Sequence, residues 1–283
     1  MKQCFRFSHT LESDFSGEPW RLLVLLSVAF ALDSSDRVCN QTEDSKKQKF
    51  LESIAGKYAH FSVVAYHEQM GRTDFRSLVI AYGFTTLDYE NGSLVATDRY
   101  CRSVHKSNQP FLASLSDQAT SSILPVPTKV EVGEDDEGFY IWRPESPTAL
   151  GIKLENPKIE SLPKDPNDHR IFDQDQDGRP GVTVQIKMFG WLNCEIYMIR
   201  REIFAYKLRL KPERTLEGYV KDTSEQLVIG AWPWFLNRES DPLQHTDLSK
   251  SPMVLVPVDD TYDCDRLLEE RSTLLPPDPE VWT

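Results

Sequence analysis

Three aspartates stand at alternate positions in the stretch IFDQDQDGRPGVTVQI, and a glycine closes the series. Positions 1, 3, 5 and 6 of a calcium loop are matched by Asp173, Asp175, Asp177 and Gly178. In such a loop the chain curls around the ion so that the carboxylates converge, the glycine permits the sharp turn, and position 7 donates its backbone carbonyl. The sequence therefore predicts a Ca²⁺ site. The predicted ligands are Asp173, Asp175, Asp177 and the carbonyl of Arg179.

The loop departs from an EF-hand at position 12, where a bidentate glutamate is replaced by Val184. The last ligand must come from water or from another acid, and the candidates are Asp165, Asp168, Asp259 and Asp260. Without the closing glutamate we expect an affinity of about 10⁻⁴–10⁻³ M, as in extracellular modules. The alternative is a solvated acidic turn, in which Asp and Gly are common anyway.

The segment after the loop alternates apolar and polar residues, which is typical of a half-buried strand. Val182, Val184, Ile186 and Met188 fall on one face of it. Further strand-like segments follow this one and are divided by KPER and DTSE. Before the loop, strand-like segments also occur from residue 61 onward. Asn91-Gly92 between apolar runs predicts a two-residue hairpin, because both turn positions need positive φ. The predicted class is all-β, a mainly antiparallel meander, sandwich or barrel, with little helix.

Composition shifts suggest a division of the chain into four parts. These are residues 1–31 (an upstream extension plus signal peptide), 32–130 (an N-terminal β region), 131–271 (a C-terminal β region with the Asp loop) and 272–283 (a loose, proline-rich tail). A single continuous β fold across residues 32–271 fits the same pattern equally well.

The N-terminal part resembles a secretory signal. Arg21 precedes an apolar run over residues 22–31 that ends in Ala-Phe-Ala, an A-x-A-like cleavage site. The run is too short to span a bilayer, which takes about 20 apolar residues. Three acids upstream do not suit a signal peptide, although a start codon assigned too early would explain them: Glu12, Asp14 and Glu18. A periplasmic or secreted location is therefore predicted; a buried core helix is the alternative.

The cysteines agree with export. Removal of the signal discards Cys4 and leaves an even four, namely Cys39, Cys101, Cys194 and Cys264. Four widely spaced cysteines in an exported chain suggest two disulfides, with three possible pairings. Buried free thiols in a cytosolic protein are the alternative. No C-x-x-C pair occurs, which argues against a zinc knuckle.

Charge and composition limit the partners. The 283-residue chain carries a formal net charge of −12, which repels phosphate backbones and attracts cations. Nucleic acid is therefore not expected as a partner, and no membrane span is expected. Hydrophobic residues make up 40% of the chain, enough for a folded core. Whether a protein, glycan or lipid is bound stays open at this stage.

Signals for an enzyme are weak, and no catalytic residue is assigned. The sequence lacks G-x-S-x-G, Walker, G-x-G-x-x-G and H-E-x-x-H patterns. His67 and Glu68 are neighbours in a strand-like segment and so face opposite ways, and His169 precedes the Asp loop. Trp232 and Trp234 belong to an aromatic cluster of the kind that lines carbohydrate sites, but packing in the core or a plug at the end of a strand is the favoured interpretation.

A resemblance to other proteins supports the prediction of an exported β-rich protein with a calcium loop. The segments FDQDQDGRPGVTVQI, CEIYMIRREIFAYKL and EQLVIGA resemble a group of uncharacterised exported proteins of Gram-negative bacteria. Those proteins carry D-x-D-x-D-G-x-P-G-V-T-V, then a Y-x-x-x-R strand and a strand near E-Q-x-V-L-G. The resemblance covers residues 171–231 and is weaker over residues 56–105. It implies an exported β-rich fold with a calcium-type loop, and it implies no activity.

Three functions are therefore considered. The first is an exported calcium-binding protein with a non-enzymatic binding or envelope-associated role. The second is a secreted glycan hydrolase with a structural calcium, which a pocket holding two close carboxylates beside Trp232 or Trp234 would favour. The third is a lipocalin-like carrier of a small ligand, which a closed apolar cavity without convergent acids would favour.

Overall fold

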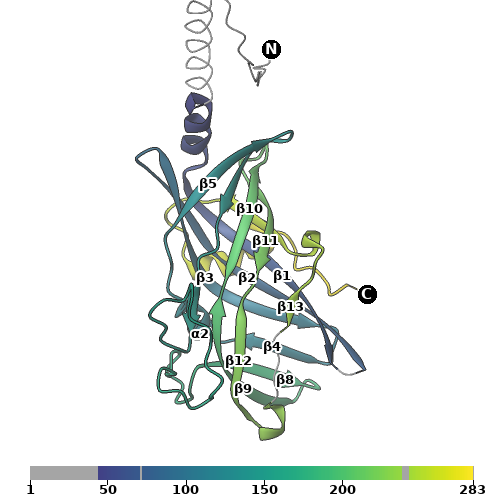
Figure 1. The fold of residues 1–283 in the computed structure, drawn as a ribbon. Helices are drawn as coiled ribbons and strands as arrows, with labels where there is room; N and C mark the ends of the chain where they lie inside the picture. The colour runs from purple at the N-terminus through teal and green to yellow at the C-terminus, as the bar shows by residue number, and fades with distance from the viewer. Residues whose placement is uncertain (1–43, 71, 238–241, 283) are drawn as a thin grey trace, which may run out of the picture. The chain divides into compact units, whose positions relative to one another are not determined.

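The computed structural model describes residues 44–70, 72–237 and 242–282 (Figure 1). The chain divides into two compact units, residues 1–53 and 54–283. A helix covers residues 44–54, while the predicted signal peptide, Cys4 and Cys39 lie outside the described residues. Within the described ranges, no helix combines the length and the apolar character needed to cross a membrane.

The second unit is built mostly from antiparallel strands, so the predicted all-β class is confirmed. The strands are β1 (Gly56–Met70), β2 (Thr73–Glu90), β3 (Ser93–Ser107), β4 (Phe111–Leu115), β5 (Thr128–Asp135), β6 (Gly138–Arg143), β7 (Thr148–Leu150), β8 (Val182–Met188), β9 (Leu192–Glu202), β10 (Phe204–Leu210), β11 (Leu216–Asp222), β12 (Glu225–Trp232), β13 (Leu243–Gln244) and β14 (Pro252–Pro257). The short helices are α2 (Asp117–Ser121), η1 (Trp234–Leu236), η2 (Leu248–Lys250) and α3 (Cys264–Leu274).

Eight of these strands close into a ring. Hydrogen bonding follows the order β3-β2-β1-β14-β11-β10-β6-β5, and β5 pairs back onto β3. The last strand of the chain, β14, lies between β1 and β11. Strand β5 runs across the boundary predicted between residues 130 and 131, and strands from both sides of that boundary join the same ring.

A second group of strands extends the sheet. β4 pairs with β3 and β8, β8 with β9, and β9 with both β12 and β7 (Figure 1). β9 continues through Ile203 into β10 of the ring, so the two groups share one long stretch of chain. The order departs from a consecutive meander here, because β12 pairs with β9 rather than with β11.

The β2–β3 hairpin forms as the sequence predicts. Asn91 and Gly92 adopt φ values of 50° and 79°, and Glu90 pairs with Ser93. Further along, a bulge shifts the register between Tyr82 and Gly83. A Cβ at Gly83 would lie 2.1 Å from the carbonyl oxygen of Arg99, so no other residue fits there. The extra residue re-aims the β3 side chains that follow it.

The two faces of β1 differ in chemistry. Its outward face is apolar and belongs to the main core: Ala59, Phe61, Val63 and Ala65. Its inward face, which lines an internal cavity, is largely polar: His60, Ser62, Val64 and Tyr66. The apolar residues lie outside because the C-terminal segment covers them.

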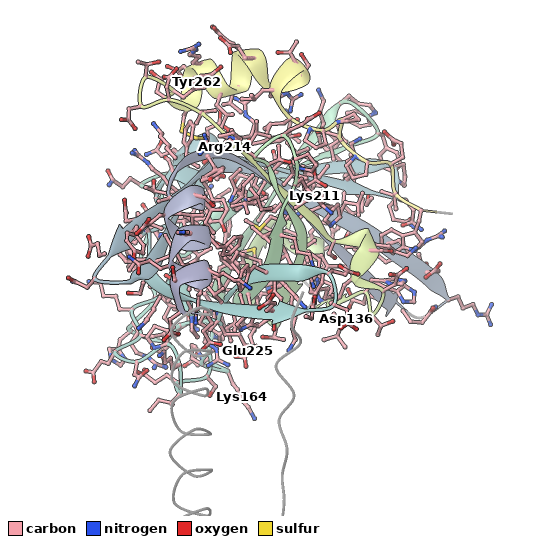
Figure 2. All side chains as sticks on the ribbon, turned by 90° about the horizontal axis from the view of Figure 1, so that it is seen from above. Asp136, Lys164, Lys211, Arg214, Glu225 and Tyr262 are labelled. Carbon is pink, nitrogen blue, oxygen red and sulfur yellow. A yellow bond between two sulfur atoms is a disulfide. The ribbon has the colours of Figure 1, made fainter. Side chains whose placement is uncertain are left out.

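Helix α3 provides that cover together with the residues after it. Leu267 is fully buried, and Leu275 is 6% exposed in the same core cluster (Figure 2, yellow). Tyr262, just before the helix, donates its hydroxyl to Glu270 at 2.6 Å. The segment after residue 272, expected to be loose, is held against the sheet up to its last described residue, because Leu275, Val281 and Trp282 pack on the same core cluster.

The cysteines form one disulfide in the described chain, between Cys101 on β3 and Cys264 at the start of α3. Cys194 is a free, buried thiol, so the prediction that it pairs is wrong. Its side chain packs among apolar residues of β8 and β9 instead.

Candidate metal centre and internal cavity

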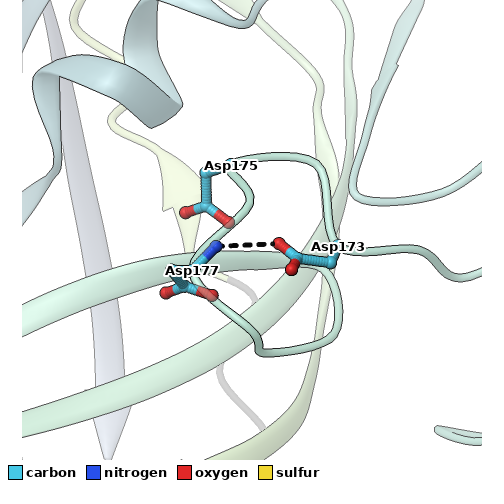
Figure 3. Close-up of side chains that lie close together, drawn as sticks. All are labelled: Asp173, Asp175 and Asp177. Carbon is cyan, nitrogen blue, oxygen red and sulfur yellow. Dashed lines mark hydrogen bonds between the residues drawn. The ribbon is translucent and has the colours of Figure 1, made fainter.

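The three predicted aspartates of the loop come together. Their carboxylates each offer an oxygen within 4.8 Å of the others (Figure 3). Asp173 shapes the loop by accepting the N–H of Asp177 at 3.2 Å and that of Gly178 at 2.9 Å. Gly178 adopts a φ of 85°, which glycine tolerates and which turns the chain back on itself. The cluster can hold a metal ion.

Asp175 is the unusual member. It is 4% exposed, and its Oδ2 accepts the N–H of Thr183 at 3.0 Å. Its Oδ1 is buried without a hydrogen-bond partner among the described residues. Burial raises the pKa of Asp175; the N–H of Thr183 opposes this effect, while the carboxylates of Asp177 and Asp173 add to it. A buried carboxylate oxygen without a donor is costly unless a cation coordinates it.

Arg179 lies at the rim of the loop. Its N–H donates to Asp177 Oδ1 at 2.8 Å, and its guanidinium lies 5.3 Å from the ring centroid of Tyr197. The contribution of its carbonyl to a metal stays a prediction.

The four acids considered as the last ligand do not join the cluster. Asp168 binds the guanidinium of Arg170 at 2.9 and 3.0 Å. Asp165 accepts the N–H of Asn167 at 2.9 Å, and Asp259 accepts the N–H of Thr261. Asp260 does not belong to the cluster either. None of these four acids therefore supplies a further ligand to the three aspartates.

The loop ties three segments together. The side chain of Gln174 accepts the N–H of Gly151 at 2.6 Å and donates to the carbonyl of Ser122 at 3.1 Å. Asp175 holds the start of β8 through Thr183. Gly151 follows β7 and Ser122 follows α2, so one loop fixes the ends of both elements and the beginning of β8.

These same segments line an internal cavity of about 130 Å³. Thr120 of α2, Leu150 of β7, and Val182 and Val184 of β8 contribute to its wall. The opposite wall comes from β1, β2, β3 and β11. A ring of eight strands has an interior just wide enough for side chains or for one small ligand.

A charged group lies on this wall, centred on Arg200 of β9. Its guanidinium donates to Glu202 at 2.7 Å, to Asp222 at 3.1 Å and to the hydroxyl of Tyr66 at 3.0 Å. Its remaining nitrogen donates to Gln226 at 2.9 Å. Tyr66 in turn donates its hydroxyl to Asp222. All of these side chains line the cavity.

A second polar group lies deeper. Arg143 and Asp98 form an ion pair at 3.1 Å, and each side chain is 3% exposed. Thr85 donates to Asp98 at 2.7 Å, and His60 bridges Thr85 and Ser62 at 2.9 Å on each side. Burial lowers the pKa of His60 to about 4, Asp98 opposes this effect and Arg143 adds to it.

The other residues considered as functional lie elsewhere. His67 contacts Asp74 at 2.6 Å on the surface, and the side chain of His169 is 92% exposed. Trp232 and Trp234 are 57% and 81% exposed, so they do not pack in the core; Trp232 ends strand β12. Neither tryptophan lines the cavity.

Sequence reasoning missed both polar groups. The sequence did contain one signal, namely polar residues at every second position of an otherwise apolar strand, as at His60 and Ser62 in YAHFSVVAY.

A comparison with protein-family models, with curated proteins and with solved structures finds no match for this chain.

Two histidines that line the cavity, His60 and His105, predict that the stability of the protein depends on pH. Burial lowers the pKa of His105 to about 4, and Arg200 adds to the shift, as burial does for His60. Below an ordinary pKa of about 6.5 the unfolded chain binds protons that the native state does not, so the free energy of unfolding falls between pH 6.5 and 4. Each histidine contributes a slope of about 1.4 kcal/mol per pH unit.

Urea unfolding at several pH values measures this slope. In the His105→Gln variant it should be shallower by about 1.4 kcal/mol per pH unit. The exposed His169→Gln variant is the matched control and should keep the original slope. Equal slopes for wild type and His105→Gln would contradict the prediction.

Proposed function

We propose that this protein is an exported, non-enzymatic binding protein whose Asp loop binds calcium and thereby fixes one wall of an internal ligand cavity. The observation that carries the calcium proposal is Asp175, whose Oδ1 is buried with no hydrogen-bond partner among the described residues, beside two further carboxylates. Calcium prefers oxygen ligands of this kind, and its charge offsets the repulsion between them.

The position of the loop supports a structural role for the ion. Gln174 and Asp175 hold the ends of three segments that line the cavity. A cation in the loop would stiffen these connections without touching the cavity. The disulfide between Cys101 and Cys264 supports export, because disulfides persist in oxidising compartments.

The cavity supports a small-ligand binding protein more than a glycan hydrolase. It lies between the closed ring of strands and the second group of strands, which includes β7, β8 and β9, and eight-stranded rings can hold one small ligand. It contains two acids, Glu202 and Asp222, so it is not the purely apolar cavity expected of a lipocalin-like carrier. The glycan hydrolase has less support, because the acids of the cavity do not lie beside Trp232 or Trp234.

Calcium should raise the melting temperature of the protein. At a concentration of about 100 times Kd, binding to the native state alone adds about 2.7 kcal/mol, a shift of several degrees for a chain of this size. For a Kd of about 10⁻⁴–10⁻³ M, 10 mM calcium is about 10 to 100 times Kd and adds about 1.4–2.7 kcal/mol. The measurement compares melting in 10 mM calcium and in excess chelator.

The Asp175→Asn variant should affect the melting temperature in opposite ways with and without calcium. Without calcium this variant should melt at the same temperature as the wild type or higher, because one of three close negative charges is removed. With calcium it should lose the rise. Asp165→Asn, an exposed acid outside the cluster, should respond as the wild type does. An unchanged rise in Asp175→Asn, or no rise in the wild type, would overturn the calcium proposal.

A further inference from the structure

The charged side chains around Arg200 in the cavity do not neutralise one another. Arg200 contacts two carboxylates, those of Glu202 and Asp222, so the three ionised groups together carry one net negative charge. The second polar group does not compensate for it, because Arg143 and Asp98 neutralise each other. The side chains of Glu202 and Asp222 are 23% and 4% exposed, so this negative charge is largely withdrawn from water. Such a charge is unfavourable unless a ligand or a proton neutralises it.

Within this charged group, one carboxylate oxygen of Glu202 is available to accept a hydrogen bond. Its Oε1 accepts from Arg200, whereas its Oε2 makes no hydrogen bond within the described part of the chain. Asp222 is saturated by contrast, since one oxygen accepts from Arg200 and Tyr66 and the other from Ser224. Burial raises the pKa of Glu202 and Asp222 adds to it, while Arg200 opposes the shift. Glu202 Oε2 is thus the acceptor offered to a ligand.

Arg200 itself has little to offer an anion. Every nitrogen of its guanidinium already donates, to Glu202, Gln226, Tyr66 or Asp222. Four of the five N–H groups of Arg200 are used in these bonds, so a ligand carboxylate would meet two protein carboxylates and one remaining N–H of Nη1. The charge pattern therefore disfavours the usual pairing of an interior arginine with an acid.

The rest of the wall suits an apolar body. Val79, Ala81, Val184, Met198 and Val220 line the cavity. Tyr100 lines it as well, and the face of an aromatic ring attracts cations. A cavity of about 150 Å³ accommodates benzene, so the 130 Å³ found here suits a molecule with a single ring or a short chain.

We infer that the cavity binds a small organic ammonium ion, with its charged nitrogen on Glu202 Oε2 and its apolar body against the β2, β8 and β11 wall. This assignment rests on the proposed binding function and specifies the class of ligand. A charge-assisted hydrogen bond contributes about 1.5–3 kcal/mol, which corresponds to roughly 10- to 100-fold in affinity.

Isothermal titration with three probes of one shape tests the inference: benzylamine, benzyl alcohol and benzoate. The full chain should bind benzylamine at least about 10-fold more tightly than benzyl alcohol, and benzoate more weakly than either. Glu202→Gln should lose the preference for the amine while binding the alcohol as before. Glu217→Gln, on the exposed side of β11, is the matched control and should retain the preference.

A second variant locates the site independently of the charge. Ala81→Leu fills the cavity and should abolish binding of the amine while the circular dichroism spectrum stays native.

Equal affinity for benzoate and benzylamine, or an amine preference that survives Glu202→Gln, would overturn the inference. If benzyl alcohol binds without any preference for the amine, the ligand class is wrong and the carrier function stands. If none of the probes binds, the ligand assignment fails, while the calcium-dependent melting still tests the loop separately.

Discussion

Replacement of Asp98 by alanine is expected to lower the free energy of unfolding by about 3–5 kcal/mol, because it leaves the guanidinium of Arg143 buried without its partner. Both side chains are 3% exposed, and the same carboxylate accepts the hydroxyl of Thr85 at 2.7 Å. The loss therefore combines an unpaired charge with an orphaned hydroxyl. Urea unfolding followed by circular dichroism measures it.

Two controls separate the ion pair from the general effect of a substitution. Asp117→Ala breaks an exposed pair with Arg102, and pairs of that kind contribute about 1 kcal/mol or less. The double variant Asp98→Leu/Arg143→Met removes both charges and should recover much of the lost stability, since apolar residues often replace buried pairs without loss. A loss below 1 kcal/mol in Asp98→Ala, or a double variant that is no better, would contradict this account.

Removal of the disulfide is expected to have a comparable effect. The disulfide closes a loop of 163 residues and so restricts the unfolded chain. The double variant Cys101→Ala/Cys264→Ala restores this chain entropy to the unfolded state, which should lower the free energy of unfolding by about 5 kcal/mol. The bond also anchors α3, whose Leu267 is fully buried against the sheet. Loss of the anchor should expose the C-terminal segment to proteases before the rest of the chain.

Urea unfolding and limited proteolysis measure the two consequences. Cys194→Ala is the matched control, since this buried cysteine is not bonded to another and its replacement leaves the loop closed. The control should keep the protease resistance of the C-terminal segment. A stability of the double variant within 1 kcal/mol of the wild type would show that packing, rather than the covalent link, holds α3 in place.

Local features of the fold were predictable from the sequence. The alternation in GVTVQIKM specifies β8, observed over Val182–Met188, because period-2 burial is a property of the strand itself. Asn91-Gly92 specifies its hairpin through backbone dihedral angles. The convergence of the three aspartates is also local, since it depends on the spacing of carboxylates along one tight loop.

The features that were missed depend on distant parts of the chain. Thr183 alternates with the apolar residues of β8, a position that predicts exposure to solvent, but it is 4% exposed because Asp175 holds its N–H under the loop. The cavity groups combine residues of β1, β9, β11 and β12, and no single segment reveals their proximity. β12 pairs with β9 whereas β11 pairs with β10, so the partner strand changes at Ile203, where the sequence has neither glycine nor proline.

The place of β14 has a consequence for the timing of folding. The ring stays open until residues 252–257 are available, because β14 fills the gap between β1 and β11. At the usual rate of synthesis, roughly 10–40 seconds separate the appearance of β1 from that of β14. Until β14 emerges, β1 and later β11 each have an unpaired edge, which is a template for aggregation. Ring closure is therefore a late event in synthesis that depends on a strand far along the chain from β1.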